Sequence, residues 1–288
     1  MTRLALLLLR WIAPLPLVLV RALGTLFGLI LYLLAGERRR VTAINLKLCF
    51  PDLNDAQRRR LARAHFRAFA QSFVDRSWLW HAPPGRLRAR IVLHNEALFT
   101  SALAAGKPVI LLSPHFIGLD AGWTRLTLDR QMMSMYANQK NRSFNASLRA
   151  GRLRFHDALL LSRQQGIRAA LKGLKSGLPF YYLPDMDFGP RDAIFVPFFG
   201  VPAATVPAIA RISALAQAVV IPCVTRLTPT GYDVSFHPAW DNYPGDDLEA
   251  ATRRMNHFIE EQVRSMPEQY LWVHKRFKTR PTGQERFY

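Results

Sequence analysis

The fold is decided by the stretch Lys107-Pro-Val-Ile-Leu-Leu-Ser-Pro-His-Phe-Ile-Gly-Leu-Asp-Ala-Gly-Trp123. Within it, Val109 to Leu112 is a short apolar run, partly β-branched, with a proline near each end. Prolines are tolerated at the ends of strands and excluded from their interiors, so this run predicts a buried strand. His115 then lies just beyond the carboxyl end of that strand.

Asp120 follows His115 after five residues, with Gly118 between them. On one continuous helix the two side chains would point about 140° apart, because each residue turns the helix by about 100°. If the chain instead turns from Pro114 to Gly118 and then enters a helix, the carboxylate can fold back onto the imidazole. A histidine oriented in this way suits a general base for a hydroxyl nucleophile. The alternative is a loop histidine and an aspartate that merely favours the first turn of a helix.

The composition points to a folded protein with an anionic partner. The sequence has 288 residues, half of them hydrophobic, which allows a substantial core in one or two domains. Lys and Arg number 39 against 20 Asp and Glu, giving a formal net charge of +19. Such an excess predicts nucleic acid, an acidic membrane surface or a phosphorylated substrate as partner. Cys49 and Cys223 show no metal-ligand spacing and no disulfide framework, so a reducing compartment fits.

Residues 3–36 are the most apolar part of the chain, interrupted by Arg10 and Arg21 and by two prolines. The last unbroken apolar run, 22–36, has 15 residues, whereas a helix that spans a bilayer needs about 20. A helix that lies in the membrane, or tilts through it, fits this pattern if the arginine side chains extend to the headgroups. The alternative is a helix buried in the protein core.

The basic run Glu37-Arg-Arg-Arg40 follows this segment and marks its cytoplasmic edge, since positive charges gather on that side of membranes. We therefore expect an N-terminal hydrophobic membrane helix over residues 1–36. The remainder, residues 37–288, is expected to form one α/β domain.

A helix is predicted from Asn54, which forms a capping box with Gln57 three residues later. Phe66, Phe69 and Phe73 recur at helical spacing and are expected to face the core. Five arginines occupy much of the remaining surface of this helix. Such a run is usually a solvated face, but beside an apolar anchor it can contact anionic headgroups. The five arginines are Arg58, Arg59, Arg60, Arg63 and Arg67.

After residue 90, strand-like and helix-like segments alternate. The strand-like runs are 91–93, 109–112, 132–137, 180–183, 219–224 and 232–236. The helix-like segments are 118–128, 143–153, 164–176, 203–216 and 248–266. This alternation predicts a layered α/β domain with a mostly parallel central sheet flanked by helices. Sites in such sheets collect at the carboxyl ends of the strands, where His115 lies.

Three further stretches could carry chemistry. The stretch 141–154, about one helix downstream of His115, begins with Asn141 and carries the guanidinium groups of Arg142, Arg149, Arg152 and Arg154. The strand at 180–183 is followed by Asp185, Asp187 and Arg191. Paired aspartates can hold a metal, but without a nearby histidine a turn-forming role is the commoner explanation. The segment 269–280 alternates like a strand and ends in a basic cluster that includes Lys275 and Arg276.

Nucleic acid is a second explanation for basic residues that are interleaved with Trp, Tyr and Phe. However, the sequence has no signature of an RNA- or DNA-binding module, and the membrane-seeking N-terminus has no role in that explanation. We therefore expect no nucleic-acid partner.

Together these stretches resemble the late (secondary) acyltransferases of lipid A biosynthesis, the bacterial family that contains lauroyl and myristoyl transferases. The resemblance covers nearly the whole chain. The His-x-x-x-x-Asp spacing is shared with glycerolipid acyltransferases and is the less specific part. The more specific parts are Asp187-Phe-Gly-Pro-Arg191, Phe195-Val-Pro-Phe-Phe-Gly200 and Trp272-Val-His-Lys-Arg-Phe-Lys-Thr-Arg-Pro281.

The resemblance implies a glycerolipid-acyltransferase-like fold in an inner-membrane enzyme that faces the cytoplasm. The donor would be acyl-acyl carrier protein, and the acceptor a hydroxyl on a fatty chain of a phosphorylated glycolipid, the lipid A precursor. The product would be an acyloxyacyl group. No metal and no cofactor are implied, and the expected partners are the carrier protein, the glycolipid and the lipids of the inner membrane.

By the same resemblance, His115 is the general base, Asp120 the carboxylate that orients it, and Arg152 assists at the reacting carbonyl. Many lauroyl-type members carry Glu where this chain has Asp120, which leaves the acyl chain length and the acylated position open. We expect substrate contacts from Asn141, Arg149, Asp185, Asp187, Arg191, Lys275 and Arg276. The alternatives are an acyltransferase for another lipid acceptor, such as a lysophospholipid, an ornithine lipid or a polyene, and a non-enzymatic protein that binds membrane or nucleic acid.

Overall fold

Strand β2 (Val109–Leu112) lies in the middle of the fold and is buried on both faces, as its sequence predicts. Its four side chains are at most 1% exposed. Val109 and Leu111 pack into one hydrophobic core, and Ile110 and Leu112 into a second core on the other face of the sheet. Alternate residues of a strand point to opposite faces, so an unbroken apolar run suits a strand covered on both sides. The structure, a computed structural model, describes residues 2–162 and 166–288.

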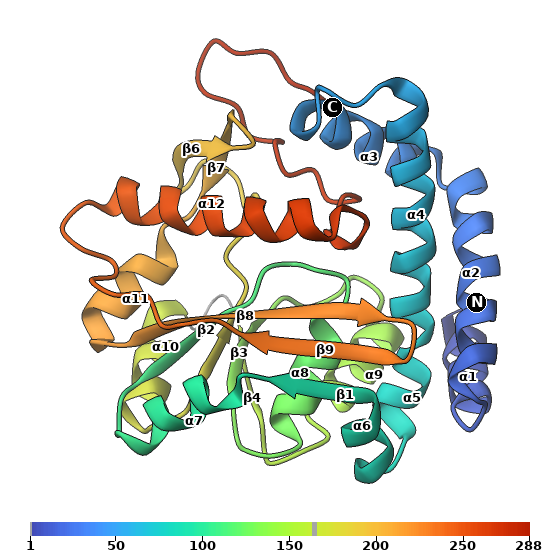
Figure 1. Ribbon diagram of the computed structural model, residues 1–288, viewed down its shortest axis with the longest axis horizontal. Helices are drawn as coiled ribbons and strands as arrows, with labels where there is room; N and C mark the ends of the chain where they lie inside the picture. The colour runs from blue at the N-terminus through green and yellow to red at the C-terminus, as the bar shows by residue number, and fades with distance from the viewer. Residues whose placement is uncertain (1, 163–165) are drawn as a thin grey trace.

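The strands around β2 form a mostly parallel sheet, which confirms the predicted fold class (Figure 1). Of the neighbouring pairs in this sheet, only β8 and β9 run antiparallel among the described residues. The described part of the chain has seven strands in it, in the order β1 (Ile91–His94), β9 (Gly231–Phe236), β8 (Val219–Thr228), β2, β5 (Phe180–Tyr182), β3 (Met133–Tyr136) and β4 (Leu159–Ser162).

Helices cover both faces of the sheet. One core is closed by α3 (Gly36–Cys49), α10 (Gly166–Lys175), α11 (Ala208–Ala216) and α12 (Leu248–Ser265). The other is closed by α5 (Arg76–His81), α6 (Pro84–Arg90), α7 (Glu96–Ala104), α8 (Leu119–Thr127) and α9 (Arg142–Arg152). The long helix α4 (Asp55–Val74) contributes to both cores, through Ala62 and Val74 respectively.

Three sequence-based assignments need correction. The predicted helix 203–216 begins only at α11, because its first residues belong to β7 (Val201–Thr205), which pairs with β6 (Ile194–Phe198) in a separate antiparallel ribbon. Each of these two strands contains a proline, which hides them in the sequence. The segment 269–280 is not a strand; Tyr270 forms a single bridge with Phe116 after the short helix η1 (Pro267–Gln269). The predicted helix 164–176 starts outside the described residues, and its described part is α10.

The N-terminal apolar segment forms two helices, α1 (Thr2–Ile12) and α2 (Leu17–Leu34), which are separated at the two prolines. Figure 1 shows both at the outer edge of the molecule, with α4 between α2 and the rest of the chain. By length and composition α2 could cross a membrane, and 22% of the helix is buried against the rest of the chain. Its 18 residues would span about 27 Å, close to the hydrocarbon thickness of a bilayer.

Two glycines allow α2 to pack closely against α4. A Cβ atom at Gly24 would lie 2.7 Å from Cα of Gln71, and one at Gly28 would lie 2.7 Å from Cα of Arg67. Small residues spaced by four place both backbones in contact along one face of a helix. The remaining faces of α2 expose a set of large apolar side chains, namely Val18, Leu19, Leu23, Leu26, Leu29, Ile30, Leu33 and Leu34.

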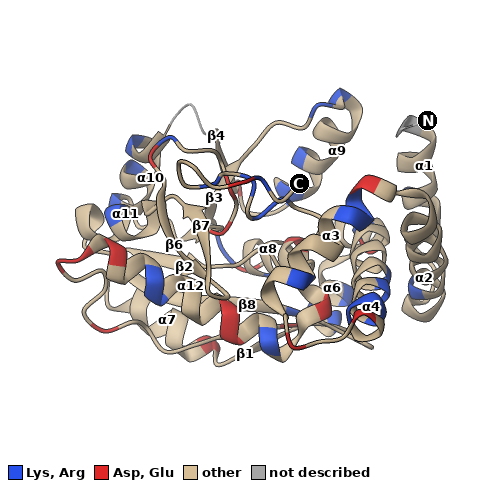
Figure 2. Cartoon of the chain, turned by 90° about the horizontal axis from the view of Figure 1, so that it is seen from above, with Lys and Arg blue, Asp and Glu red and all other residues tan. Residues whose placement is uncertain are grey.

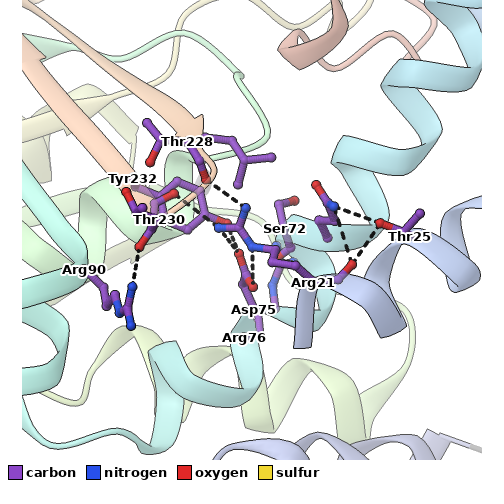
Figure 3. A network of polar contacts seen from close by, with 12 residues as sticks. Arg21, Thr25, Ser72, Asp75, Arg76, Arg90, Thr228, Thr230 and Tyr232 are labelled. Atoms are coloured by element: carbon purple, nitrogen blue, oxygen red, sulfur yellow. Dashed lines mark hydrogen bonds and ion pairs between the residues drawn. The ribbon is translucent and has the colours of Figure 1, made fainter. Parts of the chain in front are cut away.

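Arg21 is buried against the domain, which corrects the expectation that its side chain extends to the headgroups. Its guanidinium group forms an ion pair with Asp75, at 2.8 Å, and donates hydrogen bonds to the carbonyl oxygens of Thr228 and Gly231 in the β8–β9 turn (Figure 3). The hydroxyl of Tyr232 donates to the same carboxylate, at 2.6 Å. Since Arg21 faces inward, it does not interrupt the apolar surface of α2.

Helix α4 begins as predicted, with Asn54 and Gln57 forming a complete capping box. His65, in its middle, is fully enclosed, and its Nδ1–H donates to the carbonyl oxygen of Glu268 at 3.0 Å. This bond joins α4 to the chain that leads into the C-terminal segment. Burial lowers the pKa of His65 from the ordinary value of 6.5 to about 4, so the ring is neutral at pH 7.

We expect Gly28→Leu to separate α2 from α4, because the new side chain would overlap the backbone at Arg67. Overpacking of this kind costs about 1–3 kcal/mol. In detergent, limited trypsin digestion should cleave faster after Arg21, which becomes accessible when α2 detaches. Gly36→Ala is the control, since no atom lies within 4 Å of its new Cβ. Equal protection of both variants would contradict this packing.

We also expect a pH-dependent contribution to stability from His65. Its folded pKa lies below its unfolded value, so protons bind the unfolded chain more readily as the pH falls from about 6.5 towards 4. That contribution is complete above pH 6.5 and is lost below it, by about 2 kcal/mol between pH 7 and pH 5. The variant His65→Asn keeps a donor to the carbonyl oxygen of Glu268. Between pH 7 and pH 5 its free energy of unfolding, measured with denaturant, should fall by about 2 kcal/mol less than that of the parent. The exposed His257→Asn should behave like the parent.

Candidate active site

The parallel pairing of β2 with β5 brings His115 and Asp185 together. Leu112 lies opposite Tyr182 in the register, and the amide of Ser113 donates to the carbonyl oxygen of Tyr182 at 2.9 Å. His115 and Asp185 each lie three residues beyond this matched pair. Because the two strands run in the same direction, their next residues leave the sheet at the same edge.

The imidazole of His115 is held by the carboxylate of Asp185. Nδ1 of the ring lies 2.7 Å from Oδ1 of Asp185, and the backbone amide of His115 donates to both oxygens, at 3.2 and 3.0 Å. Asp185 is fully buried, while the His115 side chain remains 14% exposed. Among the described residues no partner is recorded for Nε2 of His115, so this nitrogen can accept a proton when Nδ1–H faces the carboxylate.

The segment after η1 completes the enclosure of this pair. The amide of Leu271 donates to the carbonyl oxygen of His115 at 3.1 Å, and Ile117 donates to that of Gln269 at 2.8 Å. The phenol of Tyr270 lies close enough to Asp185 to interact electrostatically with its carboxylate. Burial and then the nearby carboxylate raise the pKa of Tyr270 well above its usual value, so this phenol keeps its proton.

Electrostatics keep Asp185 ionised despite its burial. Burial by itself would raise the pKa of this carboxyl, but the charge of His115 and the hydrogen bonds from its ring and backbone outweigh burial and lower it. His274 lies in the same region and accepts a hydrogen bond from the amide of Asp187 at 3.2 Å. Its pKa falls to about 4, chiefly through burial and then through His115.

Asp120 does not orient His115, and that expectation is wrong. The helix α8 does begin near Gly118, as predicted, but the carboxylate of Asp120 binds arginines. Arg152 donates to Oδ1 through Nε, at 2.9 Å, and through a terminal nitrogen, at 2.6 Å, while Arg76 forms a close ion pair with Oδ2. Within the described residues no contact joins Asp120 to His115.

The two arginines fix the charge of Asp120. Burial would raise the pKa of this carboxyl, but Arg152 and Arg76 together lower it to about 2. The carboxylate therefore stays charged across the physiological range and serves as the shared counter-ion of α5 and α9. Arg152, expected to assist at the reacting carbonyl, is positioned here by Asp120, with its guanidinium group over the ring of Tyr136 at 5.7 Å.

Arg149 is the second arginine of α9 at this place. Its guanidinium group also lies over the ring of Tyr136, 5.5 Å from the centroid. In the part of the chain that the structure describes, no carboxylate is recorded as its ion-pair partner. Asn141, also expected in substrate binding, caps the start of α9 by accepting a hydrogen bond from the amide of Phe144.

Asp187, Lys275 and Arg276, which were also expected to contact substrate, form hydrogen bonds or ion pairs with other residues of the chain. Asp187 accepts hydrogen bonds from Gly189 and from both the amide and the hydroxyl of Thr279, and thus fastens the C-terminal segment. Lys275 forms an ion pair with Glu37 at 3.1 Å. Arg276, expected to contact substrate, is buried, and its side chain donates hydrogen bonds to Ala204 and Thr205 of β7.

Arg191 is almost fully exposed and lies beside Asp192 at 3.7 Å. The loop that carries it borders an apolar cavity of about 360 Å³, which opens beside the carboxyl end of β5. The lining includes Leu183, two residues before Asp185, together with Phe188, Ile167 and Ile212. The site thus combines a histidine–carboxylate pair with a neighbouring apolar space.

Two residues of the site were missed by the sequence analysis, Arg76 and Tyr270. Arg76 was hidden in a chain rich in arginine, and Tyr270 lay in a segment taken for a strand. The aromatic and basic composition of 269–280 was the only sequence signal for the second.

In this α/β sheet a histidine and a buried carboxylate meet at the ends of adjacent strands, an arrangement that can support general-base chemistry. The sequence from 1 to 279 matches the family described as bacterial lipid A biosynthesis acyltransferase. The chain therefore belongs to this family, and its activity is that of an acyltransferase.

Known relatives from Escherichia coli K12 carry names for several acyl groups. The chain is 28% identical to a lipid A biosynthesis lauroyltransferase, over 94% of this chain and 89% of the relative. It is 30% identical to a palmitoleoyltransferase (96% and 90%) and 32% identical to a myristoyltransferase (87% and 78%). The crystal structure of the 1-acyl-sn-glycerophosphate acyltransferase from Thermotoga maritima shows a loose likeness, with a TM-score of 0.39, 13% identity, and coverage of 85% and 97%.

We expect Asp120→Asn to destabilise the fold, because it leaves Arg76 and Arg152 partly buried without their counter-charge. Removing one partner of a buried ion pair costs about 3–5 kcal/mol. Denaturant unfolding in detergent measures the change. The control is Asp192→Asn, which alters an exposed pair and should leave stability nearly unchanged. A stable Asp120→Asn protein would show that the arginines do not depend on this carboxylate.

Proposed function

We propose that this chain is a membrane-bound enzyme that transfers a fatty acyl group from acyl-acyl carrier protein to a hydroxyl of a lipid A precursor. The observation that carries the proposal is the contact between Nδ1 of His115 and the buried carboxylate of Asp185. Family membership supports the reaction class, and this contact supplies its general base. We infer that Asp185 takes the orienting role that the sequence suggested for Asp120.

In the proposed mechanism, the acceptor hydroxyl donates its proton to Nε2 of neutral His115 as its oxygen forms a bond to the thioester carbonyl carbon. Asp185 holds Nδ1–H and stabilises the imidazolium that forms. The tetrahedral intermediate then breaks its carbon–sulfur bond. The sulfur leaves with the proton from the imidazolium, so His115 returns to its neutral form and no other reactant is required.

Arg149 is the cation best placed to bind an anionic group of the substrates, such as a phosphate or the developing oxyanion. It lies on α9 next to Arg152, whose charge is already matched by Asp120. A guanidinium group can donate two parallel hydrogen bonds to such an oxyanion or phosphate. The net charge of +19 favours the same partners, since the acceptor is phosphorylated and acyl carrier proteins are acidic.

The apolar cavity beside β5 offers a place for the acyl chain. Leu183, which lines it, lies two residues before Asp185, and the lining by Leu183, Phe188 and Ile212 suits a hydrocarbon. The names of the relatives cover different acyl groups, so the length of the chain transferred is left open.

The exposed apolar side chains of α1 and α2 support a location in the bacterial inner membrane. Leu4, Leu7, Leu8 and Trp11 on α1 continue the exposed surface of α2. Burial of apolar surface in lipid contributes roughly 25 cal/mol per Å². The basic residues of α3 and α4 follow α2 directly, and by the positive-inside tendency they support a cytoplasmic location of the catalytic domain.

We expect His115→Ala to leave a folded protein whose transfer rate falls by about 10²–10⁴, the usual worth of general-base catalysis. Asp185→Asn should also be severely impaired, because an amide cannot stabilise the imidazolium. The double variant should be hardly slower than His115→Ala, since the carboxylate acts through the base. Transfer from acyl-acyl carrier protein to the lipid A precursor, and mass spectrometry of lipid A from complemented cells, measure these effects.

A matched control lies on the edge of the sheet, where His94 and Asp233 form a second, exposed histidine–aspartate pair at 3.3 Å. His94→Ala and Asp233→Asn should keep the parental rate. Near-normal transfer by His115→Ala would refute the mechanism. Loss of activity in the His94 variant as well would show that the assay reports general damage to the sheet.

A further inference from the structure

A groove lies between α2 and α4, on the side of α4 away from the sheet. Its volume is about 440 Å³, and its lining includes Leu29 and Tyr32 from α2 and Arg60, Arg63 and Arg67 from α4. The three arginines recur after three and then four residues, so they form one stripe along the helix. Figure 2 shows the basic positions on α4 and α3 in blue beside α2, which is mostly tan.

A second groove, of about 520 Å³, continues the first at Tyr32 and extends between α3 and α4. Arg39, Arg40, Arg59 and Lys47 line it. The ring of Tyr32 joins the two grooves, because the guanidinium groups of Arg39 and Arg63 lie over it, at 5.5 and 5.7 Å from its centroid. These contacts hold two of the cations in place.

The positive charge of the first groove lies on three arginines of α4. In the described part of the protein no carboxylate forms an ion pair with Arg60, Arg63 or Arg67. Two acids of the adjoining segments have other partners: Asp55, which lines the second groove, pairs with Arg58, and Glu37 pairs with Lys275. Like charges spaced by three and four residues repel each other on a helix, so a bound anion would stabilise α4.

One wall of the groove is apolar. Leu29 lines it and is 55% exposed, and it continues into the exposed apolar surface of α2 that we assign to the membrane. A cationic wall facing an apolar wall matches a ligand that is itself anionic at one end and apolar at the other. A soluble acidic protein would not require the apolar wall.

We propose that this groove binds an anionic phospholipid, with its phosphate on Arg60, Arg63 and Arg67 and an acyl chain along Leu29. The planar guanidinium groups suit phosphate oxygens, which they bind two at a time. The lipid fills the space beside the contact of Gly28 with α4, and its phosphate neutralises the positive charge of the three arginines. The inference rests on the membrane location of α2 proposed above, and it is separate from the catalytic site.

The test uses the full-length chain purified in a neutral detergent, with added dioleoyl phosphatidylglycerol or dioleoyl phosphatidylcholine, and native mass spectrometry to count retained lipids. The parent should retain phosphatidylglycerol in preference to phosphatidylcholine. The Arg60→Gln, Arg63→Gln, Arg67→Gln variant should bind phosphatidylglycerol at least about tenfold more weakly, as expected for lost charge-assisted hydrogen bonds. The corresponding lysine variant should fall between the two, because it keeps the charge and loses the planar fork.

The matched control changes the same number of charges at exposed positions of α10, which lies on the opposite side of the molecule from α2 (Figure 1). Arg168→Gln, Lys172→Gln, Lys175→Gln should bind phosphatidylglycerol as the parent does. An equal loss in the control would show a general charge effect and overturn the proposal. Equal retention by the parent and the α4 variant would overturn it as well.

Kinetics separate this groove from a substrate site. In detergent without phospholipid, the α4 variant should keep the parental KM for both the glycolipid acceptor and the acyl carrier protein. A raised KM for either would assign the groove to that substrate and overturn the proposal. The lipid-binding measurement needs no turnover, so it remains valid if His115 proves not to be the base.

Discussion

The parallel register of β2 and β5 is the constraint on which the candidate site depends. Leu112 and Tyr182 lie opposite each other, and His115 and Asp185 each follow after three residues. A slip of the register would move the carboxylate along the edge of the sheet and away from the imidazole. Both strands are buried on their two faces, and burial fixes the register because a shift by one residue exchanges the side chains between the cores.

A set of buried ion pairs joins the N-terminal helix α2 to the elements at this edge. Asp75 and Arg76 are neighbours at the junction of α4 and α5; Asp75 binds Arg21 of α2, and Arg76 binds Asp120 of α8. Asp120 in turn binds Arg152 of α9. Each carboxylate is buried and would be costly alone, so each requires its arginine. The position of α2 and the position of α9 are thus specified through two adjacent residues.

The sequence was informative where the signal is local. The strand 109–112, the position of His115 at its end and the capping box at Asn54 all follow from neighbouring residues, and all are present in the structure. The partner of His115 was not predictable in this way. Asp185 was recognised at a strand end, but the sequence does not say which strands are adjacent, and the five-residue spacing made Asp120 the natural choice. Arg21 was misjudged for the same reason, since its partner Asp75 lies 54 residues away.

There is a physical reason why Asp185, and not Asp120, suits the role of partner to His115. A carboxylate that receives three hydrogen bonds from two arginines has its charge matched, and its pKa of about 2 reflects this. Because its negative charge is already matched by the arginines, such a carboxylate would stabilise an imidazolium only weakly. Asp185 lies beside no arginine in the recorded ion pairs of the described residues; its contacts are His115 and the neutral phenol of Tyr270. Its negative charge therefore acts mainly on the ring of His115, and this is the arrangement a general base requires.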